Sequence, residues 1–404
     1  HVLQKSIANF TFCKKIFSMK LLTLIMALVC GLVIMAQDKV VVPVVDLGKD
    51  YPEKIICVDE IADIEYIPLE TTNQSVIKEY GFVSMDASRI VVTDRFQNEI
   101  FIFGVDGKFI NKISHRGGGP KEYQTIALSC VDFDNDRIYV WDYKPLGRIK
   151  VYDFSGRYIK QINAGGAPWP DQMYVYDDSH LIVYCDPDNL SKIKTGNTPY
   201  KLINTTTGKV TPLNLTVQSQ ISRHHKEQDD DGNVSLAVLE FYPLTRAADN
   251  VIISDFSSPL AYELKNGKLI PVMKRIGGGR LSNGSLRFSS IQNLTSRQIV
   301  ISSVDAILDK HTGTYEIGDD KTICYDMMDK SIFCVDFFFK DLNRSLGIGS
   351  WNRDMPKNTA VCFISMNLLE KLHNQGKLSD KLEHLYSTLD EEANSVLLKV
   401  TFNK

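Results

Sequence analysis

The chain has 404 residues and a formal net charge of −3 at pH 7. A chain of this length buries a core large enough to fold without disulfide staples. The acidic balance and the lack of a basic stripe argue against nucleic acid as a partner, because neutralisation of phosphates by Lys and Arg supplies most of the affinity of nucleic-acid-binding proteins.

The N-terminal region has the layout of a secretory signal peptide. Lys20 precedes an uncharged apolar run, residues 21–35, and Ala36 supplies a small residue at the cleavage point. The run is shorter than the roughly 20 residues that a membrane-spanning helix needs. We therefore expect residues 1–36 to be upstream residues plus a signal peptide. Residues 37–404 would then be exported to the periplasm or the cell surface, without a transmembrane segment.

Cys30 suggests an alternative, because a lipid-anchored export signal also ends at a cysteine. The residues before it, 27–29, and the apolar residues after it do not fit such a signal, so cleavage is the favoured interpretation. Removal of residues 1–36 takes away four of the 46 basic residues and none of the 49 acidic ones, which leaves a net charge of about −7.

Six cysteines follow the signal peptide, and their spacing is irregular. Cys324 and Cys334 are the nearest pair in sequence and the candidates for a disulfide. No C-x-x-C spacing occurs, so the cysteines indicate neither a zinc site nor a redox site, and no cofactor or metal is predicted.

A strand-turn-strand pattern recurs at intervals of about fifty residues. The clearest copies are residues 89–110 and 137–159, and weaker copies begin at His180, Val251 and Ile299. The turn of each copy holds a glycine, at positions 107, 156, 208, 267 and 313. A repeat of this length, with β-branched and aromatic residues around turn glycines, is typical of a β-propeller blade.

Both ends of the chain contain further strand-like segments, namely residues 40–47, 61–69, 331–339, 360–365 and 396–402. A propeller closes its ring by building one blade from both ends, which removes unpaired edges. We therefore predict one all-β domain, residues 37–404, folded as a six-bladed β-propeller and closed by N- and C-terminal strands. Seven blades are the alternative if the terminal segments build two.

Between residues 366 and 390 the hydrophobic period changes. Leucines recur every three or four residues, as on one face of a helix. Gly376 fits a helix end and Ser379 fits the N-cap of a second helix. We predict a short helical insert that packs on the propeller as a structural latch, with a partner-binding groove as the alternative.

These segments resemble the exported six-bladed β-propeller family with NHL-like blades that is common in gut anaerobic Gram-negative bacteria. The likeness runs through most of the chain and is carried by residues 63–71, 89–162, 117–123, 309–313 and 394–398. One departure is Ser395, where the family usually has proline. The resemblance implies fold and export, and adds little about chemistry because members of the family are mostly without assigned function.

No segment carries a catalytic signature. The glycine-rich stretches 116–120, 165–168 and 275–280 each follow the third strand of a blade, which favours a crossing to the next blade over an anion site. The alternating acids of residues 132–136 lack the glycine and glutamate of a calcium loop. Neither a G-x-S-x-G elbow nor an H-E-x-x-H pair occurs.

His224 and His225, beside Arg223, form the only dense polar cluster outside the repeats. Histidine serves as base or metal ligand in many enzymes, because imidazole titrates near neutral pH. Adjacent side chains on a strand point to opposite faces, so both histidines cannot serve one site without a bend. They motivate the alternative function, a propeller enzyme such as a metal-assisted hydrolase or lyase.

Aromatic residues outside the strands are the remaining candidates for a site. Exposed aromatic faces near polar side chains suit sugars or peptides, which stack and form hydrogen bonds at once. The predicted ligand-binding residues are Glu122, Tyr123, Trp169, Trp351 and Arg353. We therefore expect an exported binding or interaction module for a small molecule, glycan or peptide. A second alternative is a structural partner of an envelope protein, which would dock on the helical insert.

Overall fold

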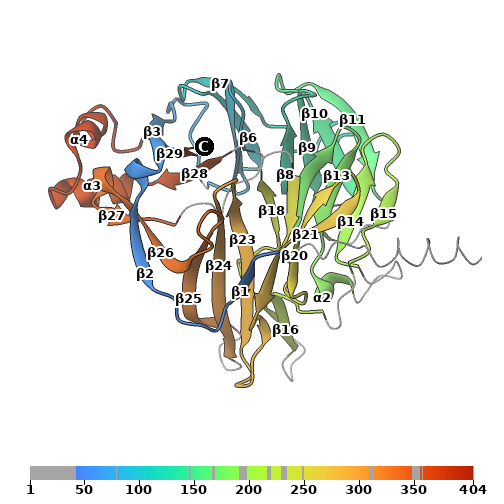
Figure 1. Cartoon of the computed structure of the whole chain (residues 1–404). Coiled ribbons are helices and arrows are strands. Elements are labelled where there is room, and N and C mark those ends of the chain that lie inside the picture. The colour runs from blue at the N-terminus through green and yellow to red at the C-terminus, as the bar shows by residue number, and fades with distance from the viewer. Residues whose placement is uncertain are drawn as a thin grey trace, which may run out of the picture. The chain divides into compact units, whose positions relative to one another are not determined.

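The computed structural model describes residues 42–403 except 79, 145–146, 166–168, 191–197, 216–219, 229–233, 248–249, 310–313, 348–354 and 357. The predicted signal segment, the Cys30 alternative, Trp351 and Arg353 therefore lie outside the described residues. The described chain is built almost entirely of antiparallel sheets (Figure 1). None of the helices among these residues is long and apolar enough to cross a membrane.

The first three blades are four-stranded sheets whose strands follow one another in sequence. The first blade comprises β4 (Phe82–Met85), β5 (Arg89–Asp94), β6 (Glu99–Gly104) and β7 (Phe109–Ile113). The second comprises β8 (Ile126–Asp132), β9 (Arg137–Asp142), β10 (Arg148–Tyr152) and β11 (Tyr158–Asn163). The third comprises β12 (Gln172–Asp177), β13 (His180–Tyr184), β14 (Tyr200–Asn204) and β15 (Val210–Pro212).

Two further blades gain an extra strand from the N-terminal region. The fourth is β18 (Leu244–Ala247), β19 (Asn250–Ile253), β20 (Leu260–Lys265) and β21 (Lys268–Ile276), with β1 (Val44–Asp46) parallel to β21. The fifth is β22 (Gly279–Arg280), β23 (Leu286–Leu294), β24 (Gln298–Asp309), β25 (Thr314–Asp326) and β26 (Ile332–Phe339), with β2 (Glu53–Cys57) parallel to β26 and β27 (Arg344–Ser345) on its end.

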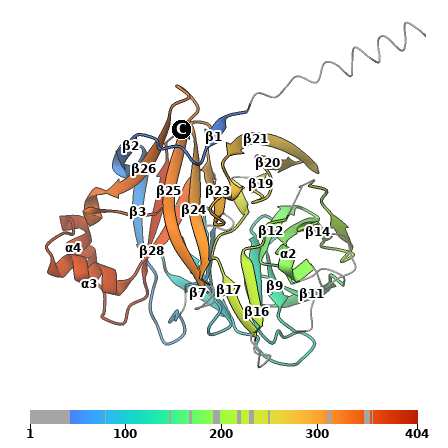
Figure 2. The same cartoon turned by 90° about the horizontal axis from the view of Figure 1, so that it is seen from below.

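The two ends of the chain share one three-stranded sheet. β29 (Val396–Phe402) lies between β28 (Thr359–Ile364) and β3 (Ala62–Pro68), antiparallel to both. The prediction that N- and C-terminal strands pair is therefore confirmed. A hairpin of β16 (His224–Gln228) and β17 (Val234–Val238) forms a separate two-stranded sheet next to β25 (Figure 2).

The predicted count of six blades, and the alternative of seven, are wrong, because the described residues form five blades of four or more strands. The N-terminal strands β1 and β2 extend the edges of existing blades, so the terminal sheet keeps only three strands. The predicted turn geometry holds where it is described, since Gly107, Gly156, Gly208 and Gly267 all have positive φ.

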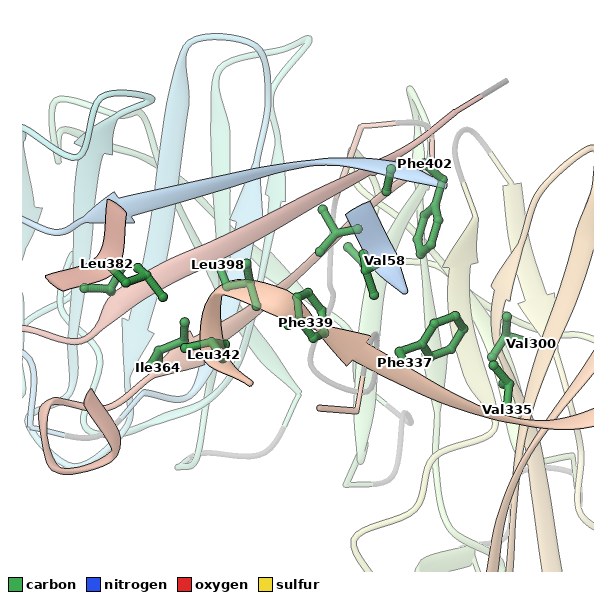
Figure 3. Close-up of a cluster of buried hydrophobic side chains, with 14 of the residues drawn as sticks. Val58, Val300, Val335, Phe337, Phe339, Leu342, Ile364, Leu382, Leu398 and Phe402 are labelled. Carbon is green, nitrogen blue, oxygen red and sulfur yellow. The ribbon is translucent and has the colours of Figure 1, made fainter. Parts of the chain in front are cut away.

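Hydrophobic clusters pack between each sheet and the next, which gives the sheets their radial arrangement. One cluster joins the terminal sheet to the first blade through Ile67, Leu397 and Phe101. Another joins the fifth blade to the terminal sheet through Phe337, Phe339 and Leu398 (Figure 3). The circuit of sheets therefore closes on itself through buried side chains.

The helical insert is present where the leucine pattern predicts it. α3 (Met366–Asn374) and α4 (Asp380–Tyr386) lie next to β28, and Leu369, Leu372 and Leu382 are buried in the cluster of Figure 3. The Ser379 hydroxyl accepts a hydrogen bond from the Leu382 amide, and Gly376 follows α3 with a φ of 62°. Burial of the leucine stripe favours the latch over a docking groove.

All six described cysteines are free thiols, so the Cys324–Cys334 disulfide does not form. Cys334 pairs with Ile323 across β25 and β26, which places Cys324 on the opposite face of the sheet from Cys334. Proximity in sequence is misleading here because neighbouring strand positions alternate between faces.

The described residues also form two 3₁₀ turns and one helical turn: η1 (Val58–Glu60), η2 (Lys340–Leu342) and α2 (Pro187–Leu190). Val58 and Leu342 bury their side chains in the cluster between the fifth blade and the terminal sheet. η1 and η2 therefore contribute to closure of the ring.

Candidate functional site

A cavity of about 640 Å³ lies where the third, fourth and fifth blades meet. Its walls come from β12 and β18, from β23 to β25, and from residues 237–242, which run from the end of β17 towards β18. We call residues 237–242 the strap. Volumes of this size are typical of small-molecule sites.

Hydrogen bonds between blades hold the floor of the cavity. The Gln172 side-chain amide donates to the carbonyl oxygen of Leu244 at 2.8 Å and accepts from its amide at 2.9 Å. Thr245 Oγ1 donates to the Ile291 carbonyl oxygen at 2.5 Å. β12, β18 and β23 are thereby linked, so the cavity has a preformed base.

Four aromatic side chains line the cavity, Tyr174, Phe241, Tyr242 and Tyr315. Phe241 packs against Phe256 and Phe288 with ring centroids 6.0 and 6.4 Å apart, which fixes the strap on the fourth and fifth blades. Aromatic walls with nearby polar groups suit ligands that have both apolar faces and hydrogen-bonding edges.

A buried charged cluster holds the strap from behind. The Arg223 guanidinium donates to the Asp171 carboxylate and, at 3.0 Å, to the carbonyl oxygen of Leu239 in the strap. It also lies 4.5 Å from the ring centroid of Tyr242, whose hydroxyl donates to Glu240 at 2.6 Å. Arg223 is thus the contact through which the cluster positions the wall of the cavity.

His224 lies between two carboxylates in this cluster. Its Nε2 is 3.0 Å from Asp171 Oδ1, and its Nδ1 is 3.9 Å from Asp186 Oδ1. The His224 side chain is 8% exposed, and its Nδ1 has no hydrogen-bond partner among the described residues. Asp186 accepts hydrogen bonds from Ser222 Oγ and, at 3.0 Å, from the Arg223 amide.

The electrostatics of the cluster follow from this arrangement. Burial alone would raise the pKa of Asp171, but the hydrogen bond from His224 and the charge of Arg223 outweigh it and lower that pKa. Burial would likewise lower the pKa of Arg223, and the charge of Asp171 reverses this. Asp171 and Arg223 therefore form a charged pair inside the protein.

The three predicted site residues that the structure describes, Glu122, Tyr123 and Trp169, do not line the cavity. Tyr123 is fully buried, its hydroxyl donates to the Asn98 carbonyl oxygen at 2.8 Å, and burial raises its pKa. Glu122 is exposed and accepts a hydrogen bond from the Gly119 amide at 2.8 Å. Trp169 is half-buried and packs edge-on against Tyr143. Tyr123 thus stabilises the segment that crosses from the first blade to the second, and it is not part of an open aromatic surface.

Of the histidine pair, the structure places His224 in the charged cluster, whereas the side chain of His225 lies outside the described part of the chain. The sequence reasoning missed Asp171, Asp186 and the cavity. Asp171 and Arg223 are 52 positions apart, and no spacing rule links them. Among the described residues, no three His, Cys, Asp or Glu side chains are placed to hold a metal ion.

A family model described as "Domain of unknown function (DUF4934)" matches residues 42–401. A search of curated proteins found no match. An inferred exported protein from Bacteroides fragilis has a solved structure with a TM-score of 0.62 and 14% identity, covering 89% of this chain and 100% of that one.

Two other solved structures are more distant. A member of the DUF4221 family from Bacteroides vulgatus has a TM-score of 0.41 and 10% identity, covering 85% of this chain and 97% of that one. Virginiamycin B lyase from Staphylococcus aureus has a TM-score of 0.30 and 9% identity, covering 67% of this chain and 97% of that one. The similarity to the Bacteroides fragilis structure indicates a shared fold and says nothing of chemistry.

Proposed function

We propose that this chain, which belongs to the family described as "Domain of unknown function (DUF4934)", is an exported β-propeller that binds a small ligand in the cavity between its third, fourth and fifth blades. Export is supported by the apolar run at residues 21–35 and by the description of the Bacteroides fragilis protein as exported. The NHL-like character of the blades stays part of the proposal, on the repeated segments 89–110 and 137–159.

The observation that carries the proposal is a preformed cavity whose aromatic wall is fixed from behind by a buried ion pair. Charged groups are seldom buried unless they are paired, because each loses its hydration. Here the Asp171–Arg223 pair fixes the strap, and so keeps the cavity open without a ligand. A preformed site spends less binding energy on ordering its own side chains.

Glycans and short peptides are the predicted ligand classes. Sugar rings and aliphatic side chains stack on tyrosine and phenylalanine, while Gln292 and Ser302 in the lining offer hydrogen bonds to hydroxyl or amide groups. Of the five ligand-binding residues predicted from the sequence, Tyr123 is buried. Glu122, Trp169, Trp351 and Arg353 stay a prediction for a separate contact surface.

Ligand screening by thermal shift tests this proposal. A true ligand raises the melting temperature as its concentration exceeds its dissociation constant. Phe241→Ala should lower the affinity, because Phe241 belongs to the cavity wall, whereas Trp169→Ala should leave it unchanged. An affinity that depends on Trp169 and not on Phe241 would place the ligand elsewhere and contradict the proposal.

A second candidate is an enzyme that uses His224 as a general base, which the contact between His224 and Asp171 favours. A carboxylate that orients histidine is a common catalytic arrangement. The candidate predicts that His224→Gln abolishes turnover of a bound ligand while the ligand still binds. The second alternative, docking of an envelope protein on the helical insert, stays a proposal. Leu369, Leu372 and Leu382 of the insert are buried, whereas its other leucines are partly buried.

A further inference from the structure

We propose that the ligand of this cavity carries a positively charged amine or guanidinium group, as an amino sugar or a lysine- or arginine-containing peptide does. This inference rests on the proposed function. It concerns the charge of the ligand, which the presence of a cavity alone does not determine.

The charges around the opening have one sign. Glu240 in the strap and Asp320 on β25 are exposed at the cavity, and the described residues that line it include no Lys, Arg or His. Within the described part of the chain neither carboxylate forms a salt bridge. Lys321, the residue after Asp320, instead pairs with Asp50 at 3.2 Å and with Asp319 at 3.0 Å.

The aromatic lining suits a cation as well as an apolar face. The π-face of an aromatic ring is electron-rich, and cages of several rings bind ammonium groups. Tyr242 already contacts one cation, since the Arg223 guanidinium lies 4.5 Å from its ring centroid. Tyr174, Phe241 and Tyr315 are the other aromatic residues of the wall.

The buried cluster behind the strap adds no net positive charge. Asp171 and Asp186 carry two negative charges and Arg223 one positive charge, so the cluster has a net charge of −1 with His224 neutral and zero with His224 protonated. Burial, and after it the negative charge of Asp186, raise the pKa of Tyr315 in the wall of the cavity. A cation in the cavity therefore meets negative groups in front, while behind the strap the positive charge of Arg223 is offset by its partner Asp171.

Two matched pairs of probes test the inference by isothermal titration calorimetry. One pair is the disaccharide of glucosamine and its N-acetylated form, and the other is a capped Gly-Lys-Gly peptide and its norleucine counterpart. Within each pair the main difference is the positive charge, and the two pairs separate a glycan source from a peptide source. We expect the charged member of one pair to bind about tenfold more tightly than the neutral member.

Added salt should reduce this difference, because the rim carboxylates are exposed and their attraction is screened. The double variant Glu240→Gln, Asp320→Asn should abolish the difference in affinity between the charged and the neutral probe. The control Asp390→Asn, Glu391→Gln removes the same two charges from an exposed loop and should leave it unchanged.

Three results overturn the inference. Neutral probes that bind as tightly as charged ones, with an affinity that falls in Phe241→Ala, contradict the charge while the proposed function stands. Charged probes whose affinity is the same in Phe241→Ala and in the unmodified protein bind outside the cavity. This result contradicts both the inference about ligand charge and the proposed function. Failure of all four probes at millimolar concentration rules out these cationic ligands.

Discussion

Replacement of Arg223 by alanine should destabilise the protein far more than removal of an ordinary surface arginine. The Arg223 side chain is 4% exposed and its Asp171 partner 5% exposed. Arg223→Ala would leave Asp171 charged inside the protein, would remove a donor from the Leu239 carbonyl oxygen and would expose one face of Tyr242. Breaking a buried pair from one side costs about 3–5 kcal/mol.

Urea denaturation measures this cost as the change in the free energy of unfolding. The matched control is Arg157→Ala, because Arg157 pairs with Asp153 at 2.9 Å but is 80% exposed. Its partner Asp153 is only 9% exposed, but the exposed Arg157 guanidinium stays hydrated, so we expect the pair to contribute about 0–1 kcal/mol, as surface pairs do. The conservative variant Arg223→Lys keeps the charge and should restore part of the loss, since lysine cannot bond Asp171 and Leu239 with one planar fork.

A cost of Arg223→Ala that equals the cost of Arg157→Ala would refute the reasoning. It would mean that the pair is hydrated in solution, and that the strap is not held from behind. Ligand affinity gives an independent readout, because Arg223→Ala should lower it even at temperatures where the variant is fully folded. An unchanged affinity would remove the link between the cluster and the cavity.

Three further predictions follow from local contacts. Because the pKa of Asp171 is lowered in the folded protein, its contribution to stability is present above about pH 4 and is lost as the pH falls through the folded-state pKa. Asp171→Asn should therefore flatten the decline of the urea midpoint in acid. An unchanged decline contradicts the assignment. Ser379→Ala removes the cap of α4 and should cost about 1 kcal/mol in the same assay, whereas the exposed Ser387→Ala serves as the control. Burial raises the pKa of the Cys324 thiol to about 12. Thiol labelling of the native protein followed by mass spectrometry should therefore find Cys324 unmodified. A Cys324–Cys334 crosslinked peptide would disprove the sheet register.

Local sequence patterns predicted the strands well, because their signals lie within a few residues. The turn glycines at 107 and 156 are needed for a positive φ, and the Ser379 cap depends on a neighbour three positions away. Burial of the leucine stripe in the helical insert also follows from its period.

The number of blades could not be read in the same way. It depends on which edges β1 and β2 join, and both are short strands that pair in parallel with β21 and β26 far away in sequence. A strand-like pattern at a terminus indicates that a strand forms, but does not indicate its partner.

The site was the least predictable part. The sequence predicts Tyr123 as an exposed aromatic, yet its ring packs against Tyr152 and its hydroxyl donates to the Asn98 carbonyl oxygen inside a crossing between blades. The cavity joins residues from three blades and the strap, so only the fold brings them together. The polar residues next to His224 in the sequence indicate a candidate site there, whereas no sequence pattern near Asp171 or Asp186 indicates their place in the cluster.

Hydrogen exchange with mass spectrometry, with and without the glucosamine disaccharide or the capped Gly-Lys-Gly peptide, tests the location of the binding site most directly. Bound ligand slows exchange where it covers or stabilises the backbone. Protection in peptides that cover the strap and residues 314–320, but not residues 120–125, is the result that the cavity proposal predicts. Protection confined to the surroundings of Glu122 and Trp169 would contradict it.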